Sequence, residues 1–144
     1  MEKIDVAIIG GGIVGLAIAS SLTKEFKDVY IFEKNNSFGQ ETSSRNSEVL
    51  HYARVYYLIN SLKTKLCASG LEYIYNLNPK DVPYKKTGKL IVSHSNEEKS
   101  KLVDLLIKGK QNGAKKLRIL NKGEIKKLEP EIEAPVALYS PETG

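Results

Sequence analysis

Apolar residues recur along the chain in short runs separated by turn-forming residues, and the spacing within each run predicts a strand or a helix. The first run, residues 4–9, is continuous and β-branched, which is typical of a strand buried on both faces of a parallel sheet. A glycine-rich turn at 10–15 leads into an apolar helix, and a second strand is expected at 29–32. Residues 3–34 therefore predict a strand–helix–strand unit with parallel strands.

Beyond residue 60 the pattern predicts two longer helices, a small helix and several short strands. Ser61 is placed to cap a helix that runs to about residue 77, and residues 95–98 form a capping box that opens another. The small helix should end at Pro130. Short strands are expected at 86–94, 117–120 and 136–139. Apolar side chains at helical spacing in the two longer helices are Leu62, Leu66, Ile74, Leu77, Leu102, Val103, Leu106 and Ile107.

The two parts of the chain differ in organisation. Residues 1–60 hold the strand–helix–strand unit and a polar loop, which indicates the N-terminal part of a nucleotide-binding domain. In residues 61–144 helices and strands do not continue a parallel sheet, so this part is expected to be a partial, substrate-facing region. The predicted fold class is α/β, with a Rossmann-like βαβ unit followed by the start of an α+β region.

Composition and charge narrow the classes of partner. The chain has 144 residues, and its 41% hydrophobic and 27% charged residues are ordinary for a globular protein. The net charge of +5 comes mostly from lysines scattered among glutamates, with no interleaved aromatic residues, so no nucleic-acid partner is expected. Attraction of these lysines to acidic substrates or anionic lipid stays open, which leaves peripheral membrane contact as an alternative.

Two further features bear on location. The longest apolar run, residues 6–19, is too short to cross a bilayer and is broken by glycines, so no transmembrane segment is expected. Cys67 is the only cysteine and has no partner for an internal disulfide, which fits a reducing compartment. The sequence therefore predicts a cytoplasmic protein.

The glycine-rich turn carries the strongest chemical signal. Gly10, Gly12 and Gly15 form Gly-x-Gly-x-x-Gly directly after the first strand, with Ile13 and Val14 between the last two. The first glycine permits a tight turn, the second lets a pyrophosphate approach the backbone, and the third lets the helix pack closely on the sheet. The turn therefore predicts a dinucleotide site, and a glycine turn without a ligand is the alternative.

The second strand ends on an acid at the spacing that such a site requires. Glu33 lies eighteen residues beyond Gly15, close to the roughly 20 expected for the acid that holds a ribose hydroxyl. The helix that starts at the turn offers free N–H groups and a partial positive charge for a diphosphate. Glu33 is therefore a candidate ligand of the ribose.

The loop at 42–47, Thr-Ser-Ser-Arg-Asn-Ser, resembles the FAD oxidoreductases related to D-amino-acid oxidase. Stretches 61–67, 83–92 and 140–144 narrow the resemblance to the L-2-hydroxyglutarate oxidase (dehydrogenase) family. It covers nearly all 144 residues, but only the N-terminal part of the family's longer chain. Glycerol-3-phosphate dehydrogenases carry a similar loop, so a glycerol-3-phosphate or amino-acid oxidising member of the same FAD group is an alternative.

The resemblance implies FAD as cofactor and assigns roles to residues of this chain. The ADP half of FAD would be held by the glycine loop with Glu33 and Lys34, and the loop with Ser43 would lie along the pyrophosphate and flavin. The cofactor-binding residues implied are Gly10, Gly12, Ile13, Val14, Gly15, Glu33, Lys34, Thr42, Ser43, Ser44 and Arg45. Helix capping is the alternative for the two serines, and an exposed position is the alternative for the arginine.

The implied reaction oxidises a small-molecule 2-hydroxy acid to a 2-oxo acid with hydride transfer to flavin. His51 matches the histidine near the flavin in the family's loop and is the candidate catalytic residue, with a packing or surface role as the alternative. Glycines of that loop are replaced by Glu48, Arg54 and Asn60, and Tyr52 is an inserted residue. These departures are expected to shift or crowd the flavin face.

Catalysis by this chain alone is not expected. A flavin must be fixed against a substrate pocket by the whole fold, and this chain supplies only part of it. The alternatives are a non-catalytic remnant and a subunit of a split enzyme, completed by a complementary C-terminal chain. A plain NAD-binding protein is a further alternative, in which the loop at 42–47 would have no role.

Overall fold

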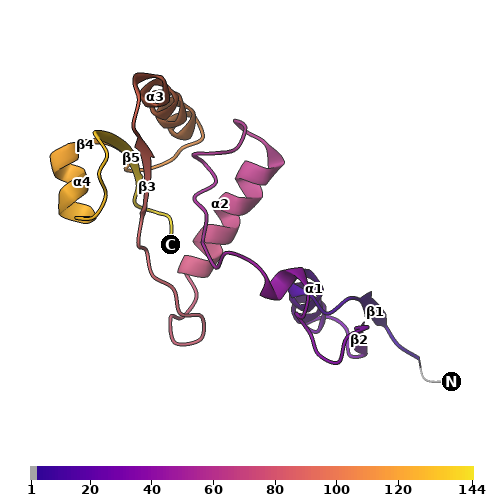
Figure 1. Cartoon of the computed structure of the whole chain (residues 1–144). Helices are drawn as coiled ribbons and strands as arrows, with labels where there is room; N and C mark the ends of the chain where they lie inside the picture. The colour runs from indigo at the N-terminus through magenta and orange to yellow at the C-terminus, as the bar shows by residue number, and fades with distance from the viewer. Residues whose placement is uncertain (1–2) are drawn as a thin grey trace. The chain divides into compact units, whose positions relative to one another are not determined.

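The computed structural model describes residues 3–144, which divide into two compact units between Glu48 and Val49 (Figure 1). The first unit contains β1 (Val6–Ile9), α1 (Ile13–Leu22), β2 (Val29–Phe32) and the 3-10 helix η1 (Thr42–Ser44). The second contains α2 (Leu62–Tyr75), β3 (Lys89–Ser93), α3 (Asn96–Gln111), β4 (Arg118–Asn121), α4 (Lys122–Leu128) and β5 (Val136–Ser140).

The first unit is the predicted βαβ unit. Strands β1 and β2 pair in parallel, with Val6 opposite Val29 and Ile9 opposite Phe32. Helix α1 covers the sheet, and Ile8 is 9% exposed beneath it. The expected burial of the first strand on both faces is wrong, because Ile9 is 83% and Phe32 51% exposed. A two-stranded sheet with one helix leaves its other face to solvent.

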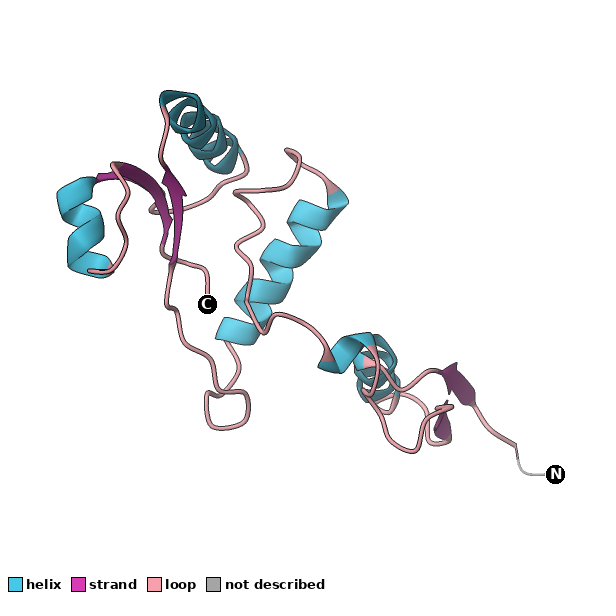
Figure 2. Ribbon diagram, in the orientation of Figure 1, coloured by secondary structure: helices cyan, strands magenta, loops and turns pink. Residues whose placement is uncertain are grey.

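The second unit is built on an antiparallel sheet with the order β3-β5-β4. Because side chains alternate along the central strand β5, Leu138 contributes to one core cluster and Ala137 to the other. The first cluster includes Leu71 of α2 and Leu102 of α3, and the second includes Ile125 of α4. Figure 2 shows α2 and α4 on opposite sides of the strands. Parallel strands in the first unit and helices beside an antiparallel sheet in the second agree with the predicted α/β class.

Residues 49–60 belong to the second unit, although the expected domain boundary is residue 60. Tyr52 is 5% exposed and Val55 is fully buried in the cluster that contains Leu138. The hydroxyl of Tyr52 also accepts a hydrogen bond from the N–H of Lys115 (2.9 Å). These long-range contacts place the boundary between the two compact units after residue 48.

Helix α2 begins where the sequence predicts but buries a different face. The Ser61 hydroxyl accepts a hydrogen bond from the N–H of Thr64 (3.2 Å), as expected of a cap. Leu62 and Leu66, expected to face the core, are 71% and 62% exposed. The buried side chains of the helix are Thr64, Ala68 and Leu71. Burial of Thr64 is possible because its hydroxyl donates to the carbonyl of Leu58 (2.9 Å).

The expected capping box of α3 is half formed. The Ser95 hydroxyl accepts a hydrogen bond from the N–H of Glu98 (3.1 Å). The Glu98 carboxylate, however, accepts from the N–H of His94 (2.7 Å) instead of returning to Ser95. A complete box opens α4, between Asn121 and Glu124. Among residues 3–144, no helix combines the length and apolar character that crossing a membrane requires.

Candidate cofactor site

The glycine turn of the first unit has a backbone that side chains would obstruct. Gly10 has φ +102°, and its N–H donates to the carbonyl of Phe32 (2.8 Å) at the end of β2. A Cβ at position 15 would lie 2.0 Å from the carbonyl oxygen of Gly10. A Cβ at position 12 would lie 3.2 Å from the hydroxyl of Ser43, a tight contact. Because these positions carry no side chains, the backbone of the turn can lie close to a ligand above the sheet.

The N-terminus of α1 faces that space with backbone N–H groups. The N–H of Ile13 donates to the Ser43 hydroxyl (2.9 Å), so a residue 30 positions away caps the helix. Within residues 3–144, the N–H groups of Val14 and Gly15 have no hydrogen-bond partner. Unpaired N–H groups and the helix dipole make this end suited to a phosphate.

Glu33 is held at the end of β2 by the backbone. Its two carboxylate oxygens accept hydrogen bonds from the N–H of Gly11 (2.7 Å) and of Asn35 (3.0 Å). The bond from Asn35, followed by that from Gly11, lowers the pKa of Glu33 below its ordinary value. The carboxylate is therefore ionised at neutral pH, and its oxygens keep lone pairs for a further donor.

A cleft of about 320 Å³ brings most of the candidate residues together. The strand ends contribute Ile9 and Phe32, the turn contributes Gly10 and Gly12, and the following loops contribute residues 33–35 and 39–43. The cleft is therefore lined by apolar side chains of the strand ends, by glycine backbone and by polar groups of the loops. This combination suits a ligand with an aromatic base and a charged or hydroxylated remainder.

An ion pair lies in the loops that line the cleft. Lys34 Nζ is 2.6 Å from Glu41 Oε1, and both side chains are largely exposed. The hydrogen bond between them raises the pKa of Lys34 and lowers the pKa of Glu41. Lys34 was a candidate from the sequence, whereas Glu41 was not.

Sequence analysis missed several residues that shape the cleft. Gly11 and Asn35 donate to Glu33, and Gly39 has φ +69° and donates its N–H to the carbonyl of Gly11 (2.9 Å). The turn at Gly39 could be predicted from the sequence, because a glycine closing a polar loop favours a left-handed turn. The roles of Gly11 and Asn35 depend on the side-chain direction of Glu33, which no sequence spacing gives.

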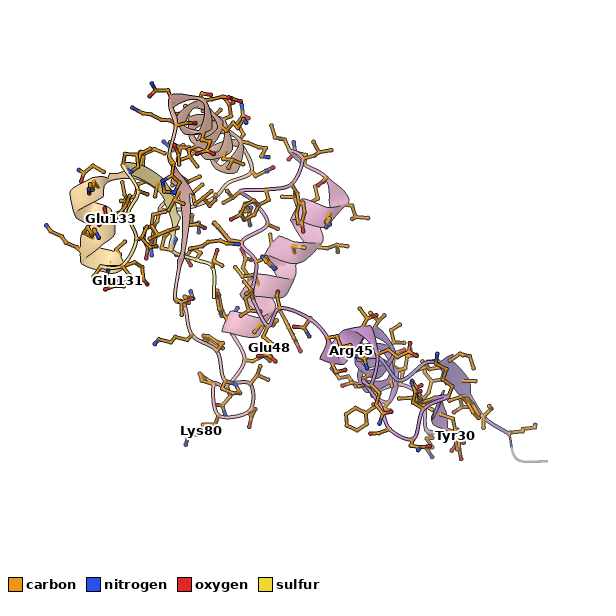
Figure 3. The ribbon with its side chains drawn as sticks, viewed as in Figure 1. Tyr30, Arg45, Glu48, Lys80, Glu131 and Glu133 are labelled. Carbon is orange, nitrogen blue, oxygen red and sulfur yellow. The ribbon has the colours of Figure 1, made fainter. Side chains whose placement is uncertain are left out.

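Four candidate residues contribute no side chain to the cleft. Ile13 and Val14 are 66% and 69% exposed and do not line the cleft. Ser44 donates its hydroxyl to the carbonyl of Glu41 (3.0 Å), which closes the turn of η1. Arg45 is exposed and donates its backbone N–H to Thr42 (3.2 Å); Figure 3 shows its side chain beside this turn.

His51 lies in the second unit, while the cleft lies in the first. The residue is exposed, and its carbonyl accepts a hydrogen bond from the N–H of Ala53 (2.9 Å). Its catalytic role stays a prediction.

Two of the three residues that replace glycines of the family's loop keep the backbone conformation that glycine favours. Glu48 has φ +54° and Asn60 has φ +59°, so both occupy the left-handed region that glycine favours. Arg54 differs, because its guanidinium is used inside the second unit: it donates to the carbonyl of Asn112 (2.7 Å) and pairs with Glu72.

The first unit fits the ADP half of a dinucleotide such as FAD. The absence of a side chain at Gly12 lets the turn lie close to Ser43, and the first-turn N–H groups of α1 are suited to anionic oxygens. Glu33, ionised and fixed by two backbone bonds, is suited to a ribose hydroxyl. The donor set is that of a nucleotide site.

Comparisons with known proteins agree with this geometry. The family model described as FAD dependent oxidoreductase (DAO) matches residues 5–144. An L-2-hydroxyglutarate dehydrogenase from Arabidopsis thaliana is 44% identical over 99% of this chain and 30% of its own length. The Homo sapiens protein of the same description is 40% identical over 99% of this chain and 31% of its own. The chain thus spans about a third of the length of these relatives.

Solved structures of two oxidases share the fold. An L-alpha-glycerophosphate oxidase from Mycoplasma pneumoniae, solved with FAD bound, superimposes with a TM-score of 0.87 at 30% identity, covering 99% of this chain and 38% of its own. A glycine oxidase from Geobacillus kaustophilus gives a TM-score of 0.83 at 26% identity over all of this chain and 40% of its own. By its match along residues 5–144, this chain belongs to the DAO family of FAD dependent oxidoreductases.

Proposed function

We propose that this chain is the FAD-binding N-terminal part of a flavoprotein that oxidises L-2-hydroxyglutarate to the 2-oxo acid. The cleft between the glycine turn and Glu33 carries the proposal, together with the 44% identity to an L-2-hydroxyglutarate dehydrogenase. When bound, FAD supplies the redox chemistry by accepting a hydride from C2 of the substrate.

The roles of the protein groups follow from their positions in the first unit. The N–H groups of Val14 and Gly15 donate to the pyrophosphate, and Glu33 accepts a hydrogen bond from a ribose hydroxyl. Ser43 holds the N–H of Ile13 and thereby fixes the loop at 39–43 against the start of α1. Ser44 and Arg45 shape the turn of η1 without entering the cleft.

Titration with ADP and with FAD, followed by tyrosine or flavin fluorescence, tests the cleft. Gly12→Val places a branched side chain in the path of the pyrophosphate, and Glu33→Ala removes the ribose acceptor, so both should weaken binding. Matched controls are Gly70→Ala and Glu131→Ala, at exposed positions of the second unit. Equal affinity of the wild type and both cleft variants contradicts the assignment.

The chain by itself is expected to show no oxidation of L-2-hydroxyglutarate. It spans about a third of the length of its relatives, and fixing a flavin against a substrate requires the supporting residues of a complete fold. The assay uses FAD-reconstituted protein, L-2-hydroxyglutarate and an artificial electron acceptor. Substrate-dependent reduction that His51→Ala abolishes would contradict this expectation and would support a catalytic role for His51.

A second candidate substrate comes from the structural comparison. The glycerophosphate oxidase superimposes on 99% of this chain, which favours a glycerol-3-phosphate oxidising member as the alternative. The same assay with L-α-glycerophosphate in place of L-2-hydroxyglutarate, on the chain supplemented with the remainder of either relative, separates the two. Turnover with only one of the two substrates shows which of the two enzymes this chain belongs to.

The chain's missing activity is proposed to be completed by a complementary C-terminal polypeptide. The exposed side chains of Tyr30 and Ile31 support this proposal, because they lie on β2 outside the cleft, where further strands and helices would cover them. Co-expression with the C-terminal remainder of the Arabidopsis relative should then restore FAD-dependent turnover. A chain that stays inactive and does not associate with that remainder favours a non-catalytic remnant.

The proposed location is the cytoplasm. Cys67 is unpaired in the structure, in agreement with a reducing compartment. The curated relatives are described as mitochondrial, which is the alternative location. Cell fractionation with an antibody against the chain distinguishes the two.

A further inference from the structure

The loop that carries Glu41 is fastened to the glycine turn on both sides of this residue. Before it, the N–H of Gly39 donates to the carbonyl of Gly11 (2.9 Å). After it, the hydroxyl of Ser43 accepts a hydrogen bond from the N–H of Ile13 (2.9 Å). Glu41 is therefore held at the cleft by two contacts that it does not itself make.

The cleft has a single cation, and Glu41 occupies it. Among the described residues that line the cleft, the charged side chains are those of Glu33, Lys34 and Glu41. Lys34 Nζ lies 2.6 Å from Glu41 Oε1. The hydrogen bond with Lys34 is the main cause of the lowered pKa of Glu41, and the charge of Glu33 acts in the opposite direction. Two carboxylates and one ammonium leave this lining with an excess negative charge.

This arrangement bears on what a bound nucleotide carries on its ribose. In dinucleotide sites the acid after the second strand accepts a ribose hydroxyl, whereas a cation nearby accommodates a phosphate in place of that hydroxyl. Lys34 directly follows Glu33 and is the residue placed to act as that cation. A phosphate on the ribose would have to displace Glu41 from Lys34 and would also lie close to the ionised Glu33. A free hydroxyl meets neither obstacle.

We propose that Glu41 is a specificity-determining residue, which holds Lys34 and thereby makes the cleft reject nucleotides that carry a phosphate on the adenosine ribose. FAD has free hydroxyls there and belongs to the accepted class, whereas NADP belongs to the rejected class. The selection works by repulsion of the wrong ligand rather than by a new contact with the right one. It rests on the proposed function, because it requires the ADP half of the cofactor to lie in this cleft.

Isothermal titration calorimetry with ADP-ribose and with its 2′-phosphorylated form tests the proposal, since the two ligands differ only in that phosphate. The wild type should bind ADP-ribose about tenfold more tightly, because like charges brought together oppose binding. Glu41→Gln should reduce this ratio several-fold, through tighter binding of the phosphorylated ligand. Glu25→Gln is the matched control, because Glu25 is an exposed acid of the first unit that does not line the cleft. Circular dichroism checks that each variant is folded.

A double variant shows whether Glu41 acts through Lys34. Adding Lys34→Met to Glu41→Gln should abolish the gain for the phosphorylated ligand, because the released ammonium is then missing. A wild type that binds neither ligand overturns the proposed cofactor site together with this inference. The inference alone is overturned if the wild type binds both ligands equally, if Glu41→Gln and Glu25→Gln change the ratio equally, or if the double variant keeps the gain.

Discussion

At the scale of single residues, Gly15 is required by one contact. A Cβ there would lie 2.0 Å from the carbonyl oxygen of Gly10, which belongs to the backbone and cannot rotate away as a flexible side chain could. Gly15→Ala should therefore destabilise the first unit by about 1–3 kcal/mol, as overpacking does elsewhere. Urea unfolding with hydrogen exchange at α1 measures the change.

The matched control is Gly70→Ala in α2, where a Cβ meets open space. Alanine favours a helix over glycine, so this variant should gain about 0.5–1 kcal/mol when measured on dilute protein. A loss at position 70 equal to that at position 15 would show that the contact with Gly10 is not the cause.

Glu142 gives the second unit a dependence on pH. Burial pushes the pKa of Glu142 upward, but hydrogen bonds and charges from Lys86 and Lys116 outweigh it, so the pKa lies below its ordinary value of 4.5. A carboxyl with a lowered folded-state pKa stabilises the fold above the unfolded-state value. The wild type should therefore melt above Glu142→Gln at neutral pH.

That difference should be lost as pH falls from about 4.5 through the lower folded-state value, because the carboxylate is then protonated in both states. Melting temperature against pH for the two proteins provides the measurement. A difference that stays constant across this range would assign it to packing rather than charge.

At the scale of elements, the start of α2 depends on one hydroxyl. Ser61 accepts from the N–H of Thr64, and its hydroxyl is also 2.9 Å from the hydroxyl of the buried Thr64. Ser61→Ala should cost about 1 kcal/mol in the free energy of unfolding. Ser100→Ala, at an exposed site inside α3, is the control and should change little.

The elements themselves could be predicted to a large extent from the sequence. The second strand has the bounds expected, and β1 starts at Val6 rather than at residue 4. Ser61 and Ser95 cap their helices as predicted, because a cap depends on residues only a few positions apart. The buried face of α2 could not be predicted, because Thr64 becomes a core residue only through its bond to Leu58.

At the scale of the whole molecule, Leu138 connects the sheet of the second unit to its larger core. It is fully buried at the centre of β5, beside Leu71, Leu102 and Val55. Leu138→Ala should cost about 2–5 kcal/mol, because it removes buried apolar volume and leaves a cavity. Hydrogen exchange should rise across β3, β4 and β5, and exchange of β1 and β2 should stay unchanged.

Leu90→Ala is not a suitable control, because Leu90 is partly buried and packs against the second cluster. Val103→Ala on α3, where the side chain is 42% exposed, is the better control and should cost much less. Equal destabilisation by both variants would contradict the central position of Leu138.

In the candidate site, too, local spacing predicts some residues, whereas contacts between distant residues could not be predicted. Spacing alone indicated Gly10, Gly12 and Glu33, because the turn and the strand end lie within one βαβ unit. The bond from Ile13 to Ser43 spans 30 residues, and no local period encodes it.

The sequence by itself determined the order of the elements, the glycine turn and the helix caps, since each depends on backbone preferences and neighbours within one or two turns. Only the tertiary structure decided which apolar residues are buried, that Leu66 faces solvent, and that Tyr52 and Val55 join the second unit. These outcomes depend on which surfaces far apart in the chain meet, and burial is a property of that meeting rather than of any one residue.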